Sequence, residues 1–164
     1  MKLYHYAPIK NTILTEGIFS FAQGAGDIKP YIRRAKSEKR AEIIRWMEMS
    51  FPGRSRAISC ITEPIVWQGN DPMLYQFVKE RTLFSIDLDR LVADRLIEAV
   101  WCQEGQGTAP DQNRFYQVSP EKIDFSPLPW HLCNRDKGLF FGVIRHYFVI
   151  TKNGHIPPGY LSQK

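Results

Sequence analysis

The chain has 164 residues, of which 43% are hydrophobic and 13% aromatic, with 22 Lys and Arg against 17 Asp and Glu and a formal net charge of +5. This length and composition predict a single domain over residues 1–164 with one core, and argue against disorder. The sequence has no apolar run of the roughly 18–20 residues that a membrane span needs, no secretory signal and no disulfide framework. We therefore expect no membrane contact, and a cytoplasmic location or export without a cleavable signal.

Large residues alternate over residues 2–7 and predict a short strand, after which apolar residues recur at helical spacing until Gly17. Asp27 and Pro30 are helix-start signals and predict a long helix that reaches about Met49. We expect the basic first half of this helix to be solvated. The second half is expected to pack on the core through its apolar residues, namely Ile43, Ile44, Trp46 and Met47, followed by Phe51.

The later elements follow from the same patterns. In chain order they are strand 57–62, a short helix over 71–78, strand 82–88, helix 89–96, strand 97–102, a polar loop over 103–113, strand 114–118, an irregular segment 119–135, and strand 146–151 in a C-terminal hairpin that spans 144–161. Short strands mixed with about three helices predict one α+β domain.

Positive charge is concentrated between residues 29 and 56. This segment holds nine basic and three acidic residues, a net charge of +6, which leaves −1 for the remainder of the chain. A polyanion such as a nucleic acid is the physical counterpart of such a segment, although an ordinary solvated helix face would look similar. The candidate residues for binding a nucleic acid or another acceptor are Arg33, Arg34, Lys36, Lys39 and Arg40.

Several common catalytic signatures are missing from the sequence. It contains no HExxH, no P-loop, no GxGxxG and no GxSxG, and we predict no metal site. Cys60 could act as a nucleophile with His131 or His146 as its base. Its place in the middle of a predicted strand favours a buried, inert thiol instead.

The opening residues carry a more informative pattern. Leu3-Tyr4-His5-Tyr6-Ala7, followed by a helix and Gly17-Ile18, resembles the first motif of the ADP-ribosyltransferase superfamily in its His-Tyr-Glu branch. That branch includes diphtheria-toxin-like transferases and DNA-modifying toxins. The later segments 59–64, 71–75, 84–89 and 118–123 follow in a similar order, and Pro72-Met73-Leu74-Tyr75 resembles the DNA-modifying toxins. The resemblance covers residues 2–123 and implies a split sheet of short strands.

The resemblance also implies a function. A member would be a glycosyltransferase that uses NAD as its substrate and transfers ADP-ribose to a nucleic acid or protein acceptor, as a toxin, effector or modification enzyme. His5 would bind the ribose hydroxyls, Tyr6 or Tyr75 would clamp the nicotinamide, and Thr62 would line the same cleft. The chemistry also needs a carboxylate that faces the developing positive charge on the ribose.

The sequence departs from the family pattern at this carboxylate. The expected position falls near Gln112 and Asn113, and the nearby acids are Asp111 and Glu104. This difference leaves three interpretations: an amide-based variant, the transfer of a different group, or a domain that binds without transferring. The wider alternatives are a non-catalytic nucleic-acid-binding module that uses the basic helix, and an accessory or immunity-type domain that binds a protein.

Overall fold

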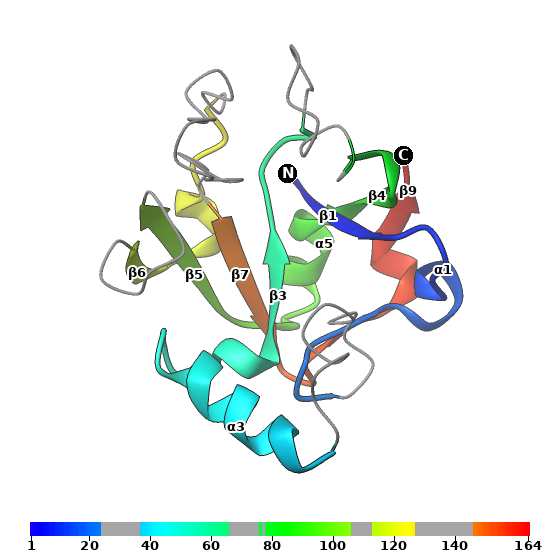
Figure 1. Ribbon diagram of the computed structural model, residues 1–164. Helices are drawn as coiled ribbons and strands as arrows, with labels where there is room; N and C mark the ends of the chain where they lie inside the picture. Colours follow the sequence, from blue (N-terminus) through cyan, green and yellow to red (C-terminus); the bar gives the residue numbers. More distant parts are fainter. Residues whose placement is uncertain (24–36, 66–75, 77, 106–112, 127–145) are drawn as a thin grey trace.

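The structure is a computed structural model that describes residues 1–23, 37–65, 76, 78–105, 113–126 and 146–164 (Figure 1). The described residues form three α-helices and nine β-strands in three antiparallel sheets, which confirms the predicted mixed α+β class. No helix in these ranges is long and apolar enough to cross a membrane.

The first sheet brings the two ends of the chain together. β1 (Lys2–Pro8) and β9 (Leu161–Gln163) pair antiparallel with opposite edges of β4 (Arg81–Asp87), as Figure 1 shows. Leu3, Phe84 and Ile86 are almost completely buried in the main core. The strand predictions for 2–7 and 82–88 are therefore confirmed to within one residue at each end.

The second sheet has the order β3 (Ala57–Cys60), β7 (His146–Thr151), β5 (Ile97–Gly105) and β6 (Asn113–Val118). Side chains alternate between its two faces, so one face joins the main core and the other forms a smaller apolar cluster. In that smaller cluster the ring of Phe51 stacks on Trp101 at 4.7 Å between centroids. Phe148 completes it, with Arg54 lying 4.2 Å above its ring.

The two sheets meet at β1 and the end of β3. Tyr4 and Ile61 form an isolated antiparallel bridge, with N–H to O distances of 2.8 and 2.9 Å. In Figure 1 the two strands stand side by side at this junction. The side chains of these neighbouring strands are therefore brought close to one another.

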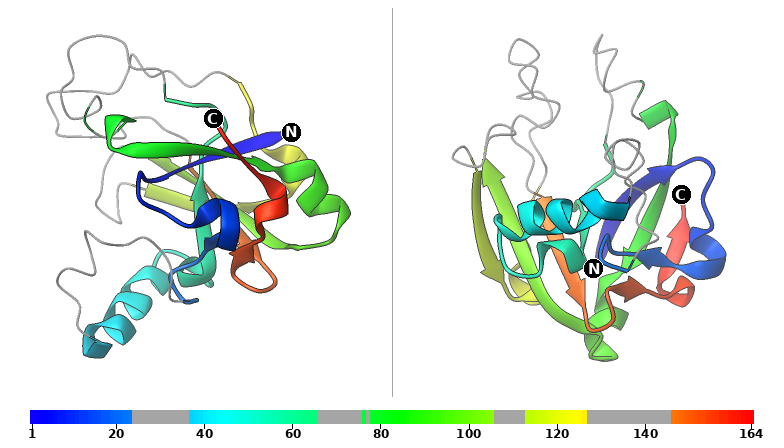
Figure 2. Two further views of the ribbon diagram at one scale, coloured as in Figure 1. Left: turned by 90° about the vertical axis from the view of Figure 1, so that its right-hand side faces the viewer. Right: turned by 60° about the horizontal axis from the view of Figure 1, so that its bottom comes forward.

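A third, two-stranded sheet pairs β2 (Ile18–Phe19) with β8 (His155–Ile156), close to α1 (Ile13–Glu16) in both views of Figure 2. This pairing corrects the prediction of a C-terminal hairpin over 144–161. The chain does turn at Gly154, whose N–H donates to Thr151 O at 3.0 Å, but β8 pairs with β2 rather than with β7. Neighbouring residues encode the turn at Gly154, so the sequence predicts it. The strand that pairs with β8 is more than 130 residues earlier in the chain, so local patterns do not indicate it.

The helices are α1, α3 (Ser37–Glu48) and α5 (Leu88–Ala93), with 3-10 turns at Arg54–Arg56, Pro120–Lys122 and Pro158–Tyr160. The end of α3 agrees with the predicted helix, while the predicted start lies outside the described residues.

One packing prediction for α3 was wrong. Met47 and Phe51 are buried, but Trp46 is 59% exposed because it lies on the outward face of the helix with Arg45 and Met49.

Several element boundaries differ from the sequence predictions: β3 ends at Cys60 rather than at 62, and α5 covers Leu88–Ala93 rather than 89–96. β5 continues to Gly105 and β6 begins at Asn113, so residues 103–105 and 113 belong to strands rather than to the predicted loop. Cross-strand pairing extends these polar strands beyond their apolar parts. The short helix predicted over 71–78 falls largely outside the described residues, and within it Gln76 and Val78 are helical.

Candidate functional site

His5 lies at the junction of the two sheets. Strand alternation places its side chain on the same face of β1 as the buried Leu3 and Ala7, and its Nδ1 lies 2.8 Å from the carbonyl oxygen of Ser59. A carbonyl only accepts hydrogen bonds, so Nδ1 carries the hydrogen and donates it. In the neutral ring, Nε2 is then the acceptor. The fold thus fixes the orientation and the tautomer of His5.

Tyr6 lies on the opposite face of β1. Its hydroxyl accepts a hydrogen bond from the backbone N–H of Ile65 at 2.9 Å and so holds the segment that follows β3. Burial raises the pKa of Tyr6 and outweighs that hydrogen bond, which acts the other way, so the phenol stays protonated at neutral pH. Since His5 and Tyr6 leave the strand on different sides, they would contact different parts of a ligand.

Thr62 directly follows the bridging residue Ile61. Its side chain is only 7% exposed, and its Oγ1 has no hydrogen-bond partner in the part of the chain that the structure describes. Leaving a buried hydroxyl unpaired costs about 1–3 kcal/mol. Thr62 therefore fits a position where a bound molecule supplies the missing partner. Tyr75, the other predicted contact, lies outside the described residues.

The side chain of Ser59 also contacts β7 of its own sheet, with Ser59 Oγ 3.4 Å from His146 Nδ1. Burial and, secondarily, the nearby Arg54 cation lower the pKa of His146 to about 4. A long contact and so low a pKa make His146 a poor general base for a serine nucleophile at neutral pH. The pair is better explained as part of the packing between β3 and β7.

Cys60 is buried, in agreement with the prediction of an inert thiol. It is 1% exposed, and its thiol contacts the carbonyl oxygen of Ile58 at 3.5 Å. Burial raises its pKa, so the reactive thiolate is disfavoured. His146 faces Ser59 rather than this thiol, and His131 lies outside the described residues.

Of the four candidates for the missing glutamate, Glu104 is the one whose side chain the structure describes. The Tyr116 hydroxyl donates to Glu104 Oε1 at 2.6 Å, and Arg114 lies across from Glu104 in the β5–β6 register. The strand order places Glu104 three strand intervals from His5, roughly 14 Å along the sheets, so a ligand would have to span the gap. Asn113 opens β6, whereas its side chain, Asp111 and Gln112 lie outside the described residues.

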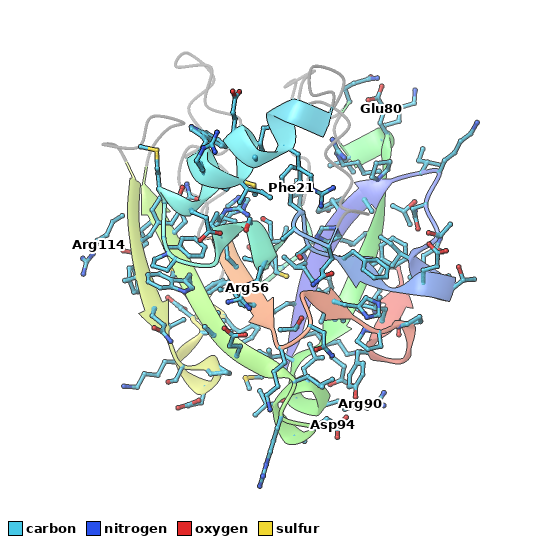
Figure 3. All side chains as sticks on the ribbon, turned by 90° about the horizontal axis from the view of Figure 1, so that it is seen from below. Phe21, Arg56, Glu80, Arg90, Asp94 and Arg114 are labelled. Atoms are coloured by element: carbon cyan, nitrogen blue, oxygen red, sulfur yellow. The ribbon has the colours of Figure 1, made fainter. Side chains whose placement is uncertain are left out.

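The basic segment is less uniformly positive than its sequence suggests. Within α3 three basic residues face three acidic ones, so the helix itself is neutral. Arg40 donates to the carbonyl oxygens of Phe21 and Ala22 at 2.7 and 2.9 Å and lies over the Phe21 ring, which Figure 3 labels beside α3. The Arg40 guanidinium thus links α3 to the Phe21–Ala22 segment, and its hydrogen bonds are made within the fold. Of the net charge of +6, four charges lie in residues 29–36, outside the described ranges, and two belong to Arg54 and Arg56. Of the predicted contacts, Arg33, Arg34, Lys36 and the side chain of Lys39 lie outside the described residues.

Two cations that follow α3 are also engaged. Arg56 forms a two-point ion pair with Glu98, with distances of 2.8 and 2.9 Å, and Arg54 lies over Phe148. The exposed cation that remains on the outward face of α3 is Arg45, beside Trp46 and Met49. The described part of the segment therefore offers little unengaged positive charge to a nucleic acid.

Sequence reasoning missed two residues of this region. Ser59 contributes a carbonyl oxygen, which no side-chain pattern reveals, and Tyr116 was read only as part of a strand. The one available signal was Ser59 itself, a polar residue between the buried Ile58 and Cys60. Among the described residues no three His, Cys, Asp or Glu side chains gather as metal ligands would. Comparison of the chain with protein-family models, curated proteins and solved structures finds no match.

Proposed function

We propose that this protein binds NAD at the junction of its two sheets and transfers ADP-ribose from it to an acceptor. The observation that carries the proposal is the position of His5, a histidine on the first strand whose ring is held by the Ser59 carbonyl of the neighbouring sheet. Residues 3–18 resemble the first motif of the ADP-ribosyltransferases, and this resemblance implies that a histidine at this position binds the ribose hydroxyls of NAD. The buried hydroxyl of Thr62 next to the junction, which no described residue pairs, adds support.

In the proposed reaction the bond between the ribose C1′ and the nicotinamide nitrogen breaks, and nicotinamide leaves as a neutral molecule with the bonding electron pair. A nucleophilic oxygen or nitrogen of the acceptor forms the new bond to C1′ and loses its proton to solvent or a nearby base. His5 and Thr62 would hold the hydroxyls of the ribose beside the adenine, and the dinucleotide would span the three strand intervals to Glu104. Glu104, held by Tyr116, is our candidate for stabilising the positive charge on the other ribose, which carries the nicotinamide.

The acceptor is assigned to a nucleic acid or a protein by the resemblance alone. Because α3 is neutral and Arg40, Arg54 and Arg56 are engaged within the fold, the described residues do not favour the alternative of a non-catalytic nucleic-acid-binding module. That alternative rests mainly on Arg33, Arg34 and Lys36, which lie outside the described residues, whereas NAD turnover is supported by the position of His5 and is our primary proposal.

The test is an incubation of the purified protein with labelled NAD, alone and with DNA, RNA or cell lysate, followed by measurement of released nicotinamide and labelled acceptor. His5→Ala should abolish both signals. His155→Ala is the matched control, because His155 also holds a backbone carbonyl, that of Glu16 at 2.6 Å, but outside the candidate site. Its turnover should match that of the unmodified protein.

Thr62→Val provides a second variant, since it keeps the shape of the side chain and removes only the hydroxyl. We expect weaker NAD binding and a fold at least as stable, because no described partner is lost. Nicotinamide release that His5→Ala leaves unchanged would refute the role of His5. Absence of NAD binding to the unmodified protein would refute the proposed function as a whole.

A further inference from the structure

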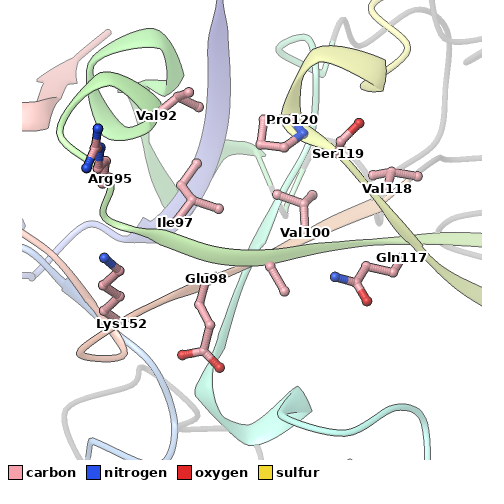
Figure 4. A pocket seen from close by; sticks show the side chains of 11 residues that line it. Val92, Arg95, Ile97, Glu98, Val100, Gln117, Val118, Ser119, Pro120 and Lys152 are labelled. Carbon is pink, nitrogen blue, oxygen red and sulfur yellow. The ribbon is translucent and has the colours of Figure 1, made fainter.

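A second candidate binding site lies away from His5, where α5, β5 and β6 meet. Here the surface forms an open hollow of about 680 Å³, shown in Figure 4. This volume is within the range of small-molecule sites. Val92, Ile97, Val118 and Pro120 give the hollow an apolar lining, and none of its lining residues belongs to the His5 site.

Two cations stand at one end of this apolar surface, Arg95 and Lys152 (Figure 4). Both side chains are exposed, and neither has a hydrogen-bond or ion-pair partner in the described part of the chain. The acids nearest to Arg95 in the sequence are already engaged: Asp94 accepts from the Tyr160 hydroxyl at 2.6 Å, and Glu98 pairs with Arg56. Glu98 also lines the hollow, but its carboxylate is held by Arg56, so Arg95 and Lys152 are the lining charges without a partner in the described part of the chain.

The backbone of Arg95 has a conformation that is unfavourable for an arginine. α5 ends in a motif in which Leu96 N–H donates to Leu91 O and Arg95 N–H donates to Val92 O, both at 3.0 Å. In this motif the residue that follows the helix end adopts a left-handed backbone conformation and is usually glycine. In this chain that residue is Arg95, with φ of +55°. An arginine is strained there, and residues with strain of this kind cluster at functional sites.

We propose that this hollow binds a small organic anion, a molecule with an apolar body and a terminal carboxylate or phosphate. The apolar body would lie on Val92, Ile97 and Pro120, and the anionic group would contact Arg95 and Lys152. Guanidinium and ammonium groups form charge-assisted hydrogen bonds with both kinds of anion. The site is independent of the proposed NAD chemistry.

The test measures binding of four probes to the full chain by calorimetry: octyl phosphate, octanoate, octanol and inorganic phosphate. Octyl phosphate or octanoate should bind, and their relative affinities distinguish a phosphate site from a carboxylate site. Octanol lacks the charge and inorganic phosphate lacks the apolar body, so each should bind at least about tenfold more weakly. Equal affinity of octanol and the two charged probes would overturn the proposal, as would equal affinity of inorganic phosphate.

Arg95→Gly separates binding from folding. Glycine relieves the strain at φ of +55°, so this variant should unfold at a higher temperature and yet bind the anionic probes about tenfold more weakly. Lys152→Gln should weaken binding similarly, and Lys10→Gln, at an exposed lysine outside the hollow, should not. Unchanged affinity in both Arg95→Gly and Lys152→Gln would refute the site. NAD turnover should persist in all three variants, so a failure here is distinct from a failure at His5.

Discussion

The imidazole Nδ1 of His5 and the carbonyl oxygen of Ser59 lie 2.8 Å apart and join the first strand of one sheet to the edge strand of the other. Next to this contact, the backbones of Tyr4 and Ile61 exchange two hydrogen bonds. Among the described residues, the side chains of His5 and Tyr6 and one short backbone bridge thus join β1 to β3 and the segment after it. His5 therefore has a structural role and a proposed functional role, and the two must be separated by experiment.

Two substitutions of His5 make this separation. An Asn amide can donate from about the position of Nδ1 but provides nothing at Nε2, whereas Ala removes both nitrogens. We expect His5→Ala to lower the free energy of unfolding by about 1–2 kcal/mol and His5→Asn to recover part of that loss. Urea denaturation measures both values. If His5→Asn also recovers full NAD turnover, the ring acts only through its bond to Ser59.

The regular parts of the fold were predictable from local patterns. The alternation of Phe84 and Ile86 and the apolar run of β7 identified two central strands, and Gly17 marked the end of α1. The partner of β8 was not predictable, because its turn is encoded locally while its pairing with β2 depends on how the whole chain packs. The exposure of Trp46 was also missed, since an aromatic residue in an amphipathic helix normally faces the core.

The candidate site was predictable only in part. The family resemblance singled out His5 as a candidate, and the strand predicted over 57–62 is present but ends at Cys60, so that Thr62 lies just beyond it. The bond to Ser59 uses a backbone atom, which every residue has, so no residue type could have indicated it. The pairing of Glu104 with Tyr116 required knowledge of the β5–β6 register, which polar residues specify weakly.

Trp46 and Phe51 should respond very differently to truncation, although both are aromatic residues of one segment. Trp46 is 59% exposed, so Trp46→Ala should change the free energy of unfolding by no more than about 0.5 kcal/mol. Phe51 is 3% exposed and stacks on Trp101, so Phe51→Ala should cost about 3–5 kcal/mol. Thermal or urea unfolding of the two variants compares them directly. Similar losses in both would contradict the packing of α3 described above.

His146 should make the stability of the protein fall in mildly acidic solution. Its pKa is about 4 in the folded state and 6.5 without the fold, so the unfolded chain binds more protons between these values and stability decreases as the pH falls through this window. From pH 7 to pH 5 the loss from this group should be about 1–2 kcal/mol. His146→Asn should show a flatter profile over this interval in urea titrations. Parallel profiles for the two proteins would exclude His146 as the cause.

Gly17 should tolerate no side chain. It ends α1 with φ of +87°, and a Cβ there would lie 2.2 Å from the carbonyl oxygen of Ile156 and 2.5 Å from Nε2 of His155. Gly17→Ala must therefore strain its own backbone and displace β8 from β2, and we expect it to cost about 3 kcal/mol or more. Gly159→Ala is the matched control, because a Cβ at Gly159 meets nothing within 4 Å and should be almost neutral. Thermal unfolding of the two variants measures the difference, and equal midpoints would show that the contact between the α1 turn and β8 does not constrain the fold.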